Sequence, residues 1–226
     1  MKNKFNLAVI FFTMLIILIA CKKESSPVLP PTGPMVPPEK DYAKAVYGRT
    51  WWGTFAYPGE LAQYYSVSFK KDSTMIFYQM SGAYIGNWSL SANQLIMEFP
   101  VQSVIITADL SAVDTLMNFT TNNNVTMIDG RLQRNLSLIE LEGTKWMGSI
   151  ISGANLRDLV LQFSGGYLSN SISMPTDTNP FQQPAGSMAM YAVGPALLQW
   201  FGLIINDSTM IGELSDYSKT WTVKKH

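Results

Sequence analysis

The sequence predicts an all-β protein whose antiparallel strands follow one another as a meander. Apolar residues recur at every second position in many short segments, which is the pattern of strands with one buried face. Clusters of Gly, Asn, Asp, Ser and Pro separate these segments and mark turns. No window long enough for a globular helix carries a capped 3.6-residue apolar period, so residues 42–46 and 109–114 remain as short helix candidates.

An internal repeat divides the body of the chain into two related units. The segment 48–55 reads GRTWWGTF and reappears at 143–150 as GTKWMGSI. The copies also end alike, because each contains a Thr-Met-Ile sequence and then runs into an alternating strand, which is 136–141 in the first copy. We therefore predict one β unit at residues 41–141 and a second at residues 142–226.

Two hairpins are predicted in the first unit, with strands at 65–69 and 74–80 and at 84–90 and 95–99. The second unit has similar strands but inserts a long, polar, proline-rich segment at 175–186. Each unit offers about six strands by this pattern, and antiparallel meanders close into barrels or pair as two sheets. Two small barrels and one composite barrel or sandwich both fit.

The N-terminus has the layout of an export signal. Lys2 and Lys4 precede an apolar run, Phe5 to Ala20, that is shorter than the roughly 18 to 20 residues of a bilayer-spanning helix. The run ends in Leu-Ile-Ala-Cys, which resembles the lipobox of bacterial lipoproteins, where the cysteine is acylated and becomes the first mature residue. We predict a signal peptide at residues 1–20 and lipidation of Cys21, the single cysteine of the chain.

Residues 21–40 would join this anchor to the β units. The segment 25–39 carries six prolines, which favour an extended spacer, although a linker without a partner has the same composition. Lys22 and Lys23 follow the cysteine in place of an aspartate, which resembles the sorting signal of outer-membrane lipoproteins. We expect a lipid-anchored outer-membrane protein, on either the periplasmic or the cell-surface face.

The composition excludes several kinds of chemistry. Loss of Lys2 and Lys4 would leave fourteen basic against sixteen acidic residues, without the basic stripe that nucleic acid requires. His226 is the single histidine and the last residue, so sites that need histidine or paired cysteines have no framework. We predict no catalytic residue, no metal and no cofactor. A pair of acids could still hydrolyse glycans, and the strand-borne candidates are Glu98, Asp109, Glu140 and Glu213.

Three motifs resemble the lipocalin-like domains of Gram-negative lipoproteins. They are the opening Gly-Trp-Gly pattern, a Phe-x-x-Asp-Ser-Thr hairpin at 69–74 and a Gly-x-Trp-x-Leu-x-x-Asn-x-Leu hairpin at 86–95. The resemblance implies that Trp51 and Trp146 pack across the floor of a barrel. The second unit lacks the Asp-Ser-Thr hairpin and carries the 175–186 insertion, so the resemblance leaves its closure open.

A strand with two apolar faces indicates a second packing surface. In 75–80 both faces are apolar, so one serves the core and the other must meet the second unit, a partner or a ligand. We favour packing between the units. The alternative is a lipocalin-type cavity lined by Trp52, Tyr78 and Met80, with Phe181 anchoring a mouth-covering loop.

These observations lead to three functional hypotheses. The first is a non-catalytic, lipid-anchored envelope lipoprotein that binds an apolar small molecule, a lipid or a protein partner. The second is a structural or envelope-interaction protein without a pocket. The third is a carboxylate-dependent glycan hydrolase, which requires two acids in one cleft.

Overall fold

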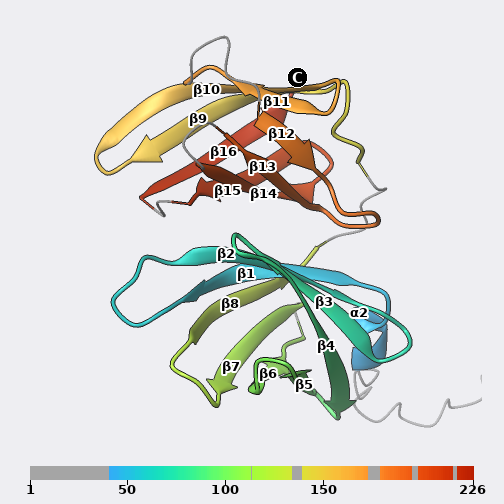
Figure 1. Ribbon diagram of the computed structural model, residues 1–226. Coiled ribbons are helices and arrows are strands. Elements are labelled where there is room, and N and C mark those ends of the chain that lie inside the picture. Colours follow the sequence, from blue (N-terminus) through green and yellow to red (C-terminus); the bar gives the residue numbers. More distant parts are fainter. Residues whose placement is uncertain (1–40, 113, 134–138, 173–178, 195–197, 216–217) are drawn as a thin grey trace, which may run out of the picture. The chain divides into compact units, whose positions relative to one another are not determined.

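The structure is a computed structural model that describes residues 41–112, 114–133, 139–172, 179–194, 198–215 and 218–226 (Figure 1). The chain divides into two units, residues 1–39 and 40–226, and every described residue belongs to the second. The predicted signal peptide, Cys21 and the tether therefore lie outside the described residues. The all-β prediction is confirmed, since the described part of the chain forms sixteen strands and one short helix.

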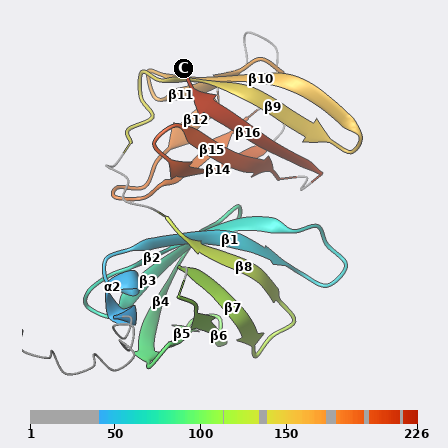
Figure 2. The same cartoon turned by 180° about the vertical axis from the view of Figure 1, so that it is seen from behind.

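The first barrel is a closed sheet of eight antiparallel strands in chain order. The strands are β1 (Thr50–Ala56), β2 (Gln63–Phe69), β3 (Thr74–Gln79), β4 (Gly82–Ser91), β5 (Gln94–Phe99), β6 (Val104–Leu110), β7 (Thr115–Thr121) and β8 (Thr126–Leu132). Closure comes from β8, which lies beside β1 and pairs with it from Trp51↔Leu132 to Ala56↔Thr126 (Figure 2). This order is that of an up-and-down barrel.

The second barrel is also closed and also has eight strands. Its strands are β9 (Lys145–Ser152), β10 (Asn155–Ser164), β11 (Tyr167–Asn170), β12 (Asn179–Gln182), β13 (Ala189–Val193), β14 (Gln199–Asn206), β15 (Thr209–Leu214) and β16 (Lys219–Lys225). The last strand pairs with the first, from Lys219↔Ser152 to Lys225↔Trp146. Two closed barrels thus replace the composite barrel or sandwich that the sequence had left open.

The repeat is visible in the backbone of the two barrels. Gly48 and Gly143 both have positive φ, +66° and +75°, just before the opening strands β1 and β9. A Cβ on Gly53 would lie 2.0 Å from the Asp129 carbonyl oxygen, and one on Gly148 would lie 2.1 Å from the Thr222 carbonyl oxygen. Glycine is required at both places because the closing strand passes too close for any side chain.

The opening tryptophans are fully buried inside their barrels, as the resemblance implied. Trp51 belongs to the first core and donates its indole N–H to the Ala45 carbonyl at 3.1 Å. Ala45 lies in the helix α2 (Tyr42–Val46), which packs into the core at the end of the barrel where β1 begins. Trp146 belongs to the second core and donates to the Thr144 hydroxyl at 2.9 Å.

The predicted hairpins and the 42–46 helix are confirmed, but three expectations about strands and helices were wrong. Residues 109–114 are not helical, since Asp109 and Leu110 end β6 and a turn follows. Each barrel has eight strands in place of six. The 175–186 segment contains β12, which pairs with β11 and β13.

The closing strand of the first unit also differs from the prediction. The first barrel is closed by β8 and the second by β16, so these two strands correspond in topology. The Thr-Met-Ile sequence of β8, however, recurs in β15 and not in β16. Residues 136–138 of the predicted closing strand lie outside the described residues, and residues 139–141 are not in a strand. Leu141 instead packs into the core of the second barrel.

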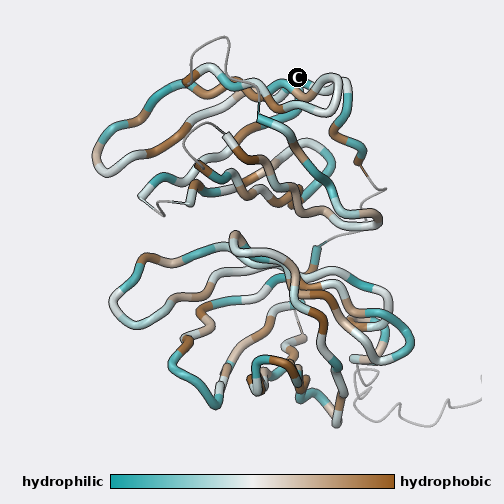
Figure 3. The backbone as a smooth tube through the Cα atoms, in the orientation of Figure 1, coloured by the Kyte–Doolittle hydropathy of each residue, from teal (hydrophilic) through white to brown (hydrophobic). Residues whose placement is uncertain are grey.

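Alternation along the strands sorts residues between the inside and the outside of each barrel. Hydrophobic residues recur along the strands of both (Figure 3). In β1, Trp51 and Phe55 belong to the interior core, while Trp52 packs on the outside. This separation of Trp51 from Trp52 is the one that a period of two requires.

Outward-facing apolar residues of the two barrels form a third cluster. Tyr78 and Met80 of the first barrel are grouped there with buried residues of the second, namely Ala189, Phe201, Leu203 and Ile211. Hydrogen bonds between the barrels accompany the cluster; in two of them, the Tyr64 amide donates to Glu213 Oε2 at 3.1 Å and the Tyr191 hydroxyl donates to the Gly82 carbonyl at 3.2 Å. The predicted packing of one unit on the other is therefore confirmed.

Candidate functional site

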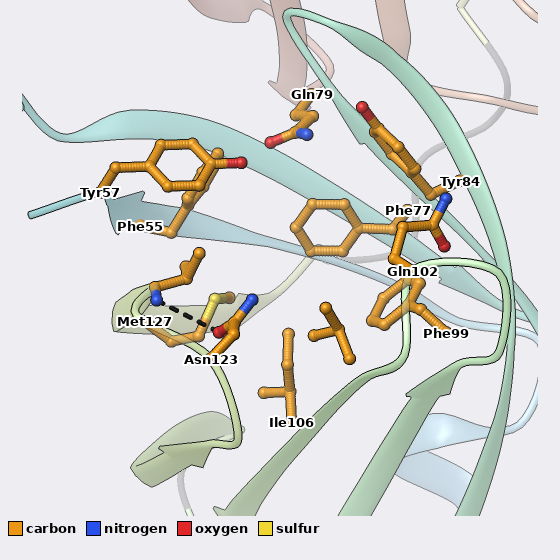
Figure 4. Close-up of a pocket in the computed structure, with 12 residues that line it drawn as sticks. Phe55, Tyr57, Phe77, Gln79, Tyr84, Phe99, Gln102, Ile106, Asn123 and Met127 are labelled. Atoms are coloured by element: carbon orange, nitrogen blue, oxygen red, sulfur yellow. Dashed lines mark hydrogen bonds between the residues drawn. The ribbon is translucent and has the colours of Figure 1, made fainter.

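A cavity of about 190 Å³ opens at one end of the first barrel (Figure 4). It lies where β1, β3 and β5 end and where β4, β6 and β8 begin, opposite the end that receives α2. Most of its lining is aromatic or aliphatic, and none of it is charged. The lining residues are Phe55, Tyr57, Phe77, Gln79, Tyr84, Phe99, Gln102, Val104, Ile106, Asn123, Val125 and Met127.

Three phenylalanines form the wall of this cavity. Phe77 stands between the other two in edge-to-face contacts, with ring centroids 6.2 Å from Phe55 and 5.6 Å from Phe99. Each of the three is almost fully buried. Edge-to-face aromatic pairs contribute about 0.5 to 1.5 kcal/mol each beyond the area that they bury, so these contacts stabilise the wall as one aromatic surface.

Tyr65 supports the phenylalanine wall from within the core of the barrel. Its ring is stacked on Phe77 at 5.0 Å, and its hydroxyl donates to the Asp129 carbonyl at 2.9 Å. A Cβ on either Gly53 or Gly130 would lie 2.9 Å from this side chain, so the two glycines make room for it. Burial, with a smaller contribution from the negative charge of Asp129, raises the pKa of Tyr65 far above its usual range, and the hydroxyl therefore stays a donor.

Strand alternation places the remaining apolar lining. On β6, Val104 and Ile106 line the cavity, while Ile105 between them is 43% exposed on the outer surface. Successive strand residues point to opposite faces of the sheet. Val104 and Ile105 are thus neighbouring aliphatic residues of one strand, with Val104 inside the barrel and Ile105 outside it.

Polar groups ring the mouth of the cavity. Gln79 donates its amide to the Ser81 hydroxyl at 3.0 Å, and that hydroxyl is 2.9 Å from the hydroxyl of Tyr84. Asn123 accepts the Val125 amide at 3.1 Å through its side-chain oxygen, while its amide nitrogen is turned toward the centre of the lining (Figure 4). These groups can donate and accept hydrogen bonds without carrying charge.

The residues predicted to bind a ligand lie away from this cavity. Trp52, Tyr78 and Met80 are brought together, but on the outside of the first barrel, where they pack in the cluster shared with the second. Arg131 lies over the Trp52 ring at 5.4 Å. Phe181 is in β12, with its ring 5.0 Å from that of Phe163 against the second core, and is not beside the other three.

Tyr78 also borders a second cavity, of about 410 Å³, whose lining, unlike that of the first, includes charged side chains. Its lining combines apolar side chains such as Phe69 and Ile76 with three cations, Arg49, Lys70 and Lys71. An apolar molecule is better matched by the uncharged aromatic lining of the first cavity.

The four acids considered for glycan hydrolysis do not line the aromatic cavity. Glu98 is exposed on β5, Asp109 of β6 accepts a hydrogen bond from Asn118 at 2.9 Å, and Glu140 is exposed before β9. Glu213 of β15 is 1% exposed beside the cluster that joins the barrels. Among the residues that the structure describes, no three His, Cys, Asp or Glu side chains gather in a way that could hold a metal.

Sequence reasoning missed the phenylalanine wall, although a usable signal was present. In an up-and-down meander, the ends of odd-numbered strands and the starts of even-numbered strands meet at one rim. Phe55 and Phe99 lie at the ends of odd-numbered strands, and Met127 lies at the start of an even-numbered strand. In the alternation of each strand, all three are at positions that point into the barrel. The inward-pointing residues at this rim, taken together, would have predicted the cavity from the sequence.

Comparison with known proteins gives no further guide. No family model, curated protein or solved structure matches this chain. Within the described residues, no helix has both the length and the apolar character needed to cross a membrane.

Proposed function

We propose that the protein is a lipid-anchored envelope lipoprotein with lipocalin-like barrels that binds a small apolar molecule or lipid segment in its first barrel. The observation that supports this most is the uncharged aromatic cavity at the mouth of that barrel. Binding pockets for small molecules are typically apolar, with a few polar groups that fix orientation. The amides and phenols around the phenylalanine wall have that arrangement.

The size of the cavity is consistent with a ring or a short acyl segment. An enclosed apolar space of about 150 Å³ is enough to hold benzene, and this cavity is somewhat larger at about 190 Å³. Its lining contains no carboxylate, histidine, cysteine or lysine that could act as an acid, base or nucleophile. We therefore propose binding without catalysis.

The cellular setting rests on the N-terminal sequence. The apolar run before Cys21 supports export and lipidation, and Lys22 and Lys23 support an outer-membrane destination. Stable anchoring needs two or more acyl chains, so the lipidated cysteine would hold the barrels at the membrane. The fold itself would then be free to bind a ligand.

A structural role in the envelope is the second candidate. It is favoured by the buried cluster in which Tyr78 and Met80 meet the second barrel, because that cluster uses the apolar outer face for packing. On this reading the packed pair of barrels meets an envelope protein through its loops.

A fluorescent reporter distinguishes these two functions. The complete mature chain, with Cys21→Ser so that no acyl chain of its own competes, is titrated with N-phenyl-1-naphthylamine, which fluoresces in apolar sites. We expect saturable binding at one site. Val104→Phe places a ring in the cavity and should weaken binding by at least about tenfold, the effect of losing roughly 1.4 kcal/mol of binding free energy.

Ile105→Phe is the matched control, because it adds the same ring on the neighbouring residue outside the barrel. It should bind the reporter like the parent chain. An absence of saturable binding in the parent chain, or equal weakening by both substitutions, would favour the structural role.

A further inference from the structure

We propose that the cavity of the first barrel selects an uncharged amphiphile, with an apolar stem and a hydroxyl or amide head, over a fatty-acid anion. This inference rests on the proposed function and specifies the ligand class of the same site. The preference for an uncharged head group follows from the positions of the charged side chains along the first barrel.

The cavity offers hydrogen bonds but no counter-ion. Its polar lining consists of three amides, Gln79, Gln102 and Asn123, and two phenols, Tyr57 and Tyr84. Figure 4 shows Gln102 beside Tyr84 and Phe99, so the amide is next to the aromatic wall. A hydroxyl or amide head can exchange hydrogen bonds with groups of this kind.

The loops around the mouth are almost free of charge. They are the four connections 57–62, 80–81, 100–103 and 122–125, which join β1 to β2, β3 to β4, β5 to β6 and β7 to β8. The ionised side chain in these loops is Glu60, whose carboxylate accepts the Gln63 amide at 3.2 Å. The charged side chain that these loops contribute is therefore negative, and it disfavours an anionic head.

Cations are present at the other end of the same barrel. Lys70 and Lys71 lie in the connection from β2 to β3, and Arg49 directly precedes β1. The α2 helix packs into the core at that end, so these residues are separated from the mouth by the filled interior. Among the residues that the structure describes, neither the cavity lining nor the four loops at the mouth hold a cation that could pair with a carboxylate.

Physical chemistry then separates two ligands of equal chain length. A carboxylate that enters an apolar site without a cation loses its hydration and gains no ion pair. A neutral head loses only the hydration of a group whose hydrogen bonds are replaced at the rim. The neutral ligand should bind more tightly even when the stems are identical.

The test is competition against the bound reporter by octan-1-ol, octanamide and octanoate, near neutral pH, using the complete mature chain with Cys21→Ser. We expect each neutral compound to compete at least about tenfold better than octanoate. Octanoate is also better solvated in water than the neutral compounds, which would weaken its binding to any apolar site. A variant that changes the charge of this site is therefore needed to show that the site itself selects the head group.

Gln102→Lys supplies the missing cation at the rim. It should improve competition by octanoate at least about tenfold while changing competition by octanol by less than about threefold. Gln94→Lys is the matched control, because Gln94 is exposed at the turn between β4 and β5, at the opposite end of the barrel. It should leave both ligands unchanged.

The outcomes separate this inference from the function on which it rests. If the reporter does not bind, the proposed function fails. If the reporter binds but octanoate competes as well as octanol, or if Gln102→Lys gives octanoate no advantage over Gln94→Lys, binding stands and selection for an uncharged head is overturned.

Discussion

The two barrels share their strand order and their opening strand, but they fill their interiors differently. In the second barrel, Trp221 lies over Gly202 and Gly212, where an added Cβ would lie 2.6 and 2.1 Å from its ring, and Trp200 is 6.2 Å away. In the first barrel, Phe77 and Phe99 border open space. The two copies thus share the backbone rules of the opening strand, while tryptophans pack closely on glycines in the described interior of one and a cavity opens in the other.

The strongest test of this difference compares two truncations. Trp221→Ala should lower the free energy of unfolding by about 4 to 5 kcal/mol, because it leaves a large void in a filled interior. Phe99→Ala should lower it by about 3 kcal/mol or less, because that side chain already borders a cavity. Urea unfolding followed by circular dichroism measures both. Equal losses would mean that the two interiors are packed alike.

A second test concerns the buried carboxyl of the second barrel. Burial raises the pKa of Glu213 from 4.5 to about 8, although the Tyr64 amide opposes the shift. The folded state therefore holds a proton that the unfolded state releases, so stability is fully present below about pH 4.5 and declines as the pH rises to about 8. Each pKa unit corresponds to ~1.4 kcal/mol, so the decline should reach a few kcal/mol.

Glu213→Gln keeps an acceptor for the Tyr64 amide and removes the titration. Its unfolding free energy should stay nearly level between about pH 5 and 8.5, while that of the parent chain falls. Glu98→Gln, an exposed carboxyl of the first barrel, is the control and should keep the decline. If Glu213→Gln follows the parent chain, the carboxyl is not buried as described.

Alanine substitutions at the two glycines that contact the closing strands test whether the opening strands β1 and β9 are equivalent. Gly53→Ala and Gly148→Ala each place a Cβ against a carbonyl of the closing strand. We expect each to cost about 2 to 3 kcal/mol, with similar values for the two barrels. Gly59→Ala, at positive φ in open space, should cost only about 1 kcal/mol. If one of the two substitutions left the free energy of unfolding unchanged, the two glycines would not be equivalent.

The smallest expected effect distinguishes the central aromatic side chains. Tyr65→Phe removes the hydroxyl that donates to the Asp129 carbonyl and should cost about 1 kcal/mol. Trp221 has an indole N–H that, within the described residues, finds no hydrogen-bond partner, so Trp221→Phe loses packing without losing such a bond. Thermal unfolding of Tyr65→Phe with and without a bound neutral ligand would show whether the hydroxyl also supports the cavity.

Local alternation was sufficient to predict the hairpins β2–β3 and β4–β5, because their residues follow a period of two between turn residues. It failed at β7, where Asn118 has φ of +52° and the pairing with β6 shifts between Thr107 and Asp109. An irregularity of this kind breaks the period of two. It failed again at β12, whose four residues include Pro180 and carry too little pattern to read.

In the strands that it identified, the sequence separated the two faces but left two uses of the outer face open. It placed Trp52 and Tyr78 on an apolar second face, which was right, but a ligand and a neighbouring barrel need the same kind of surface. The phenylalanine wall depends on which strand ends share a rim, and that follows only once all eight strands are counted. The missed strands therefore explain the missed cavity.

The closing hydrogen bonds suggest why this fold could be repeated within one chain. The backbone N–H of Gln133, just after β8, donates to the Thr50 carbonyl at the start of β1, and the backbone N–H of His226, just after β16, donates to the Lys145 carbonyl at the start of β9, both at 2.9 Å. Each barrel therefore begins and ends at one place. A gene segment that encodes such a module can be duplicated end to end without either copy having to refold around the other.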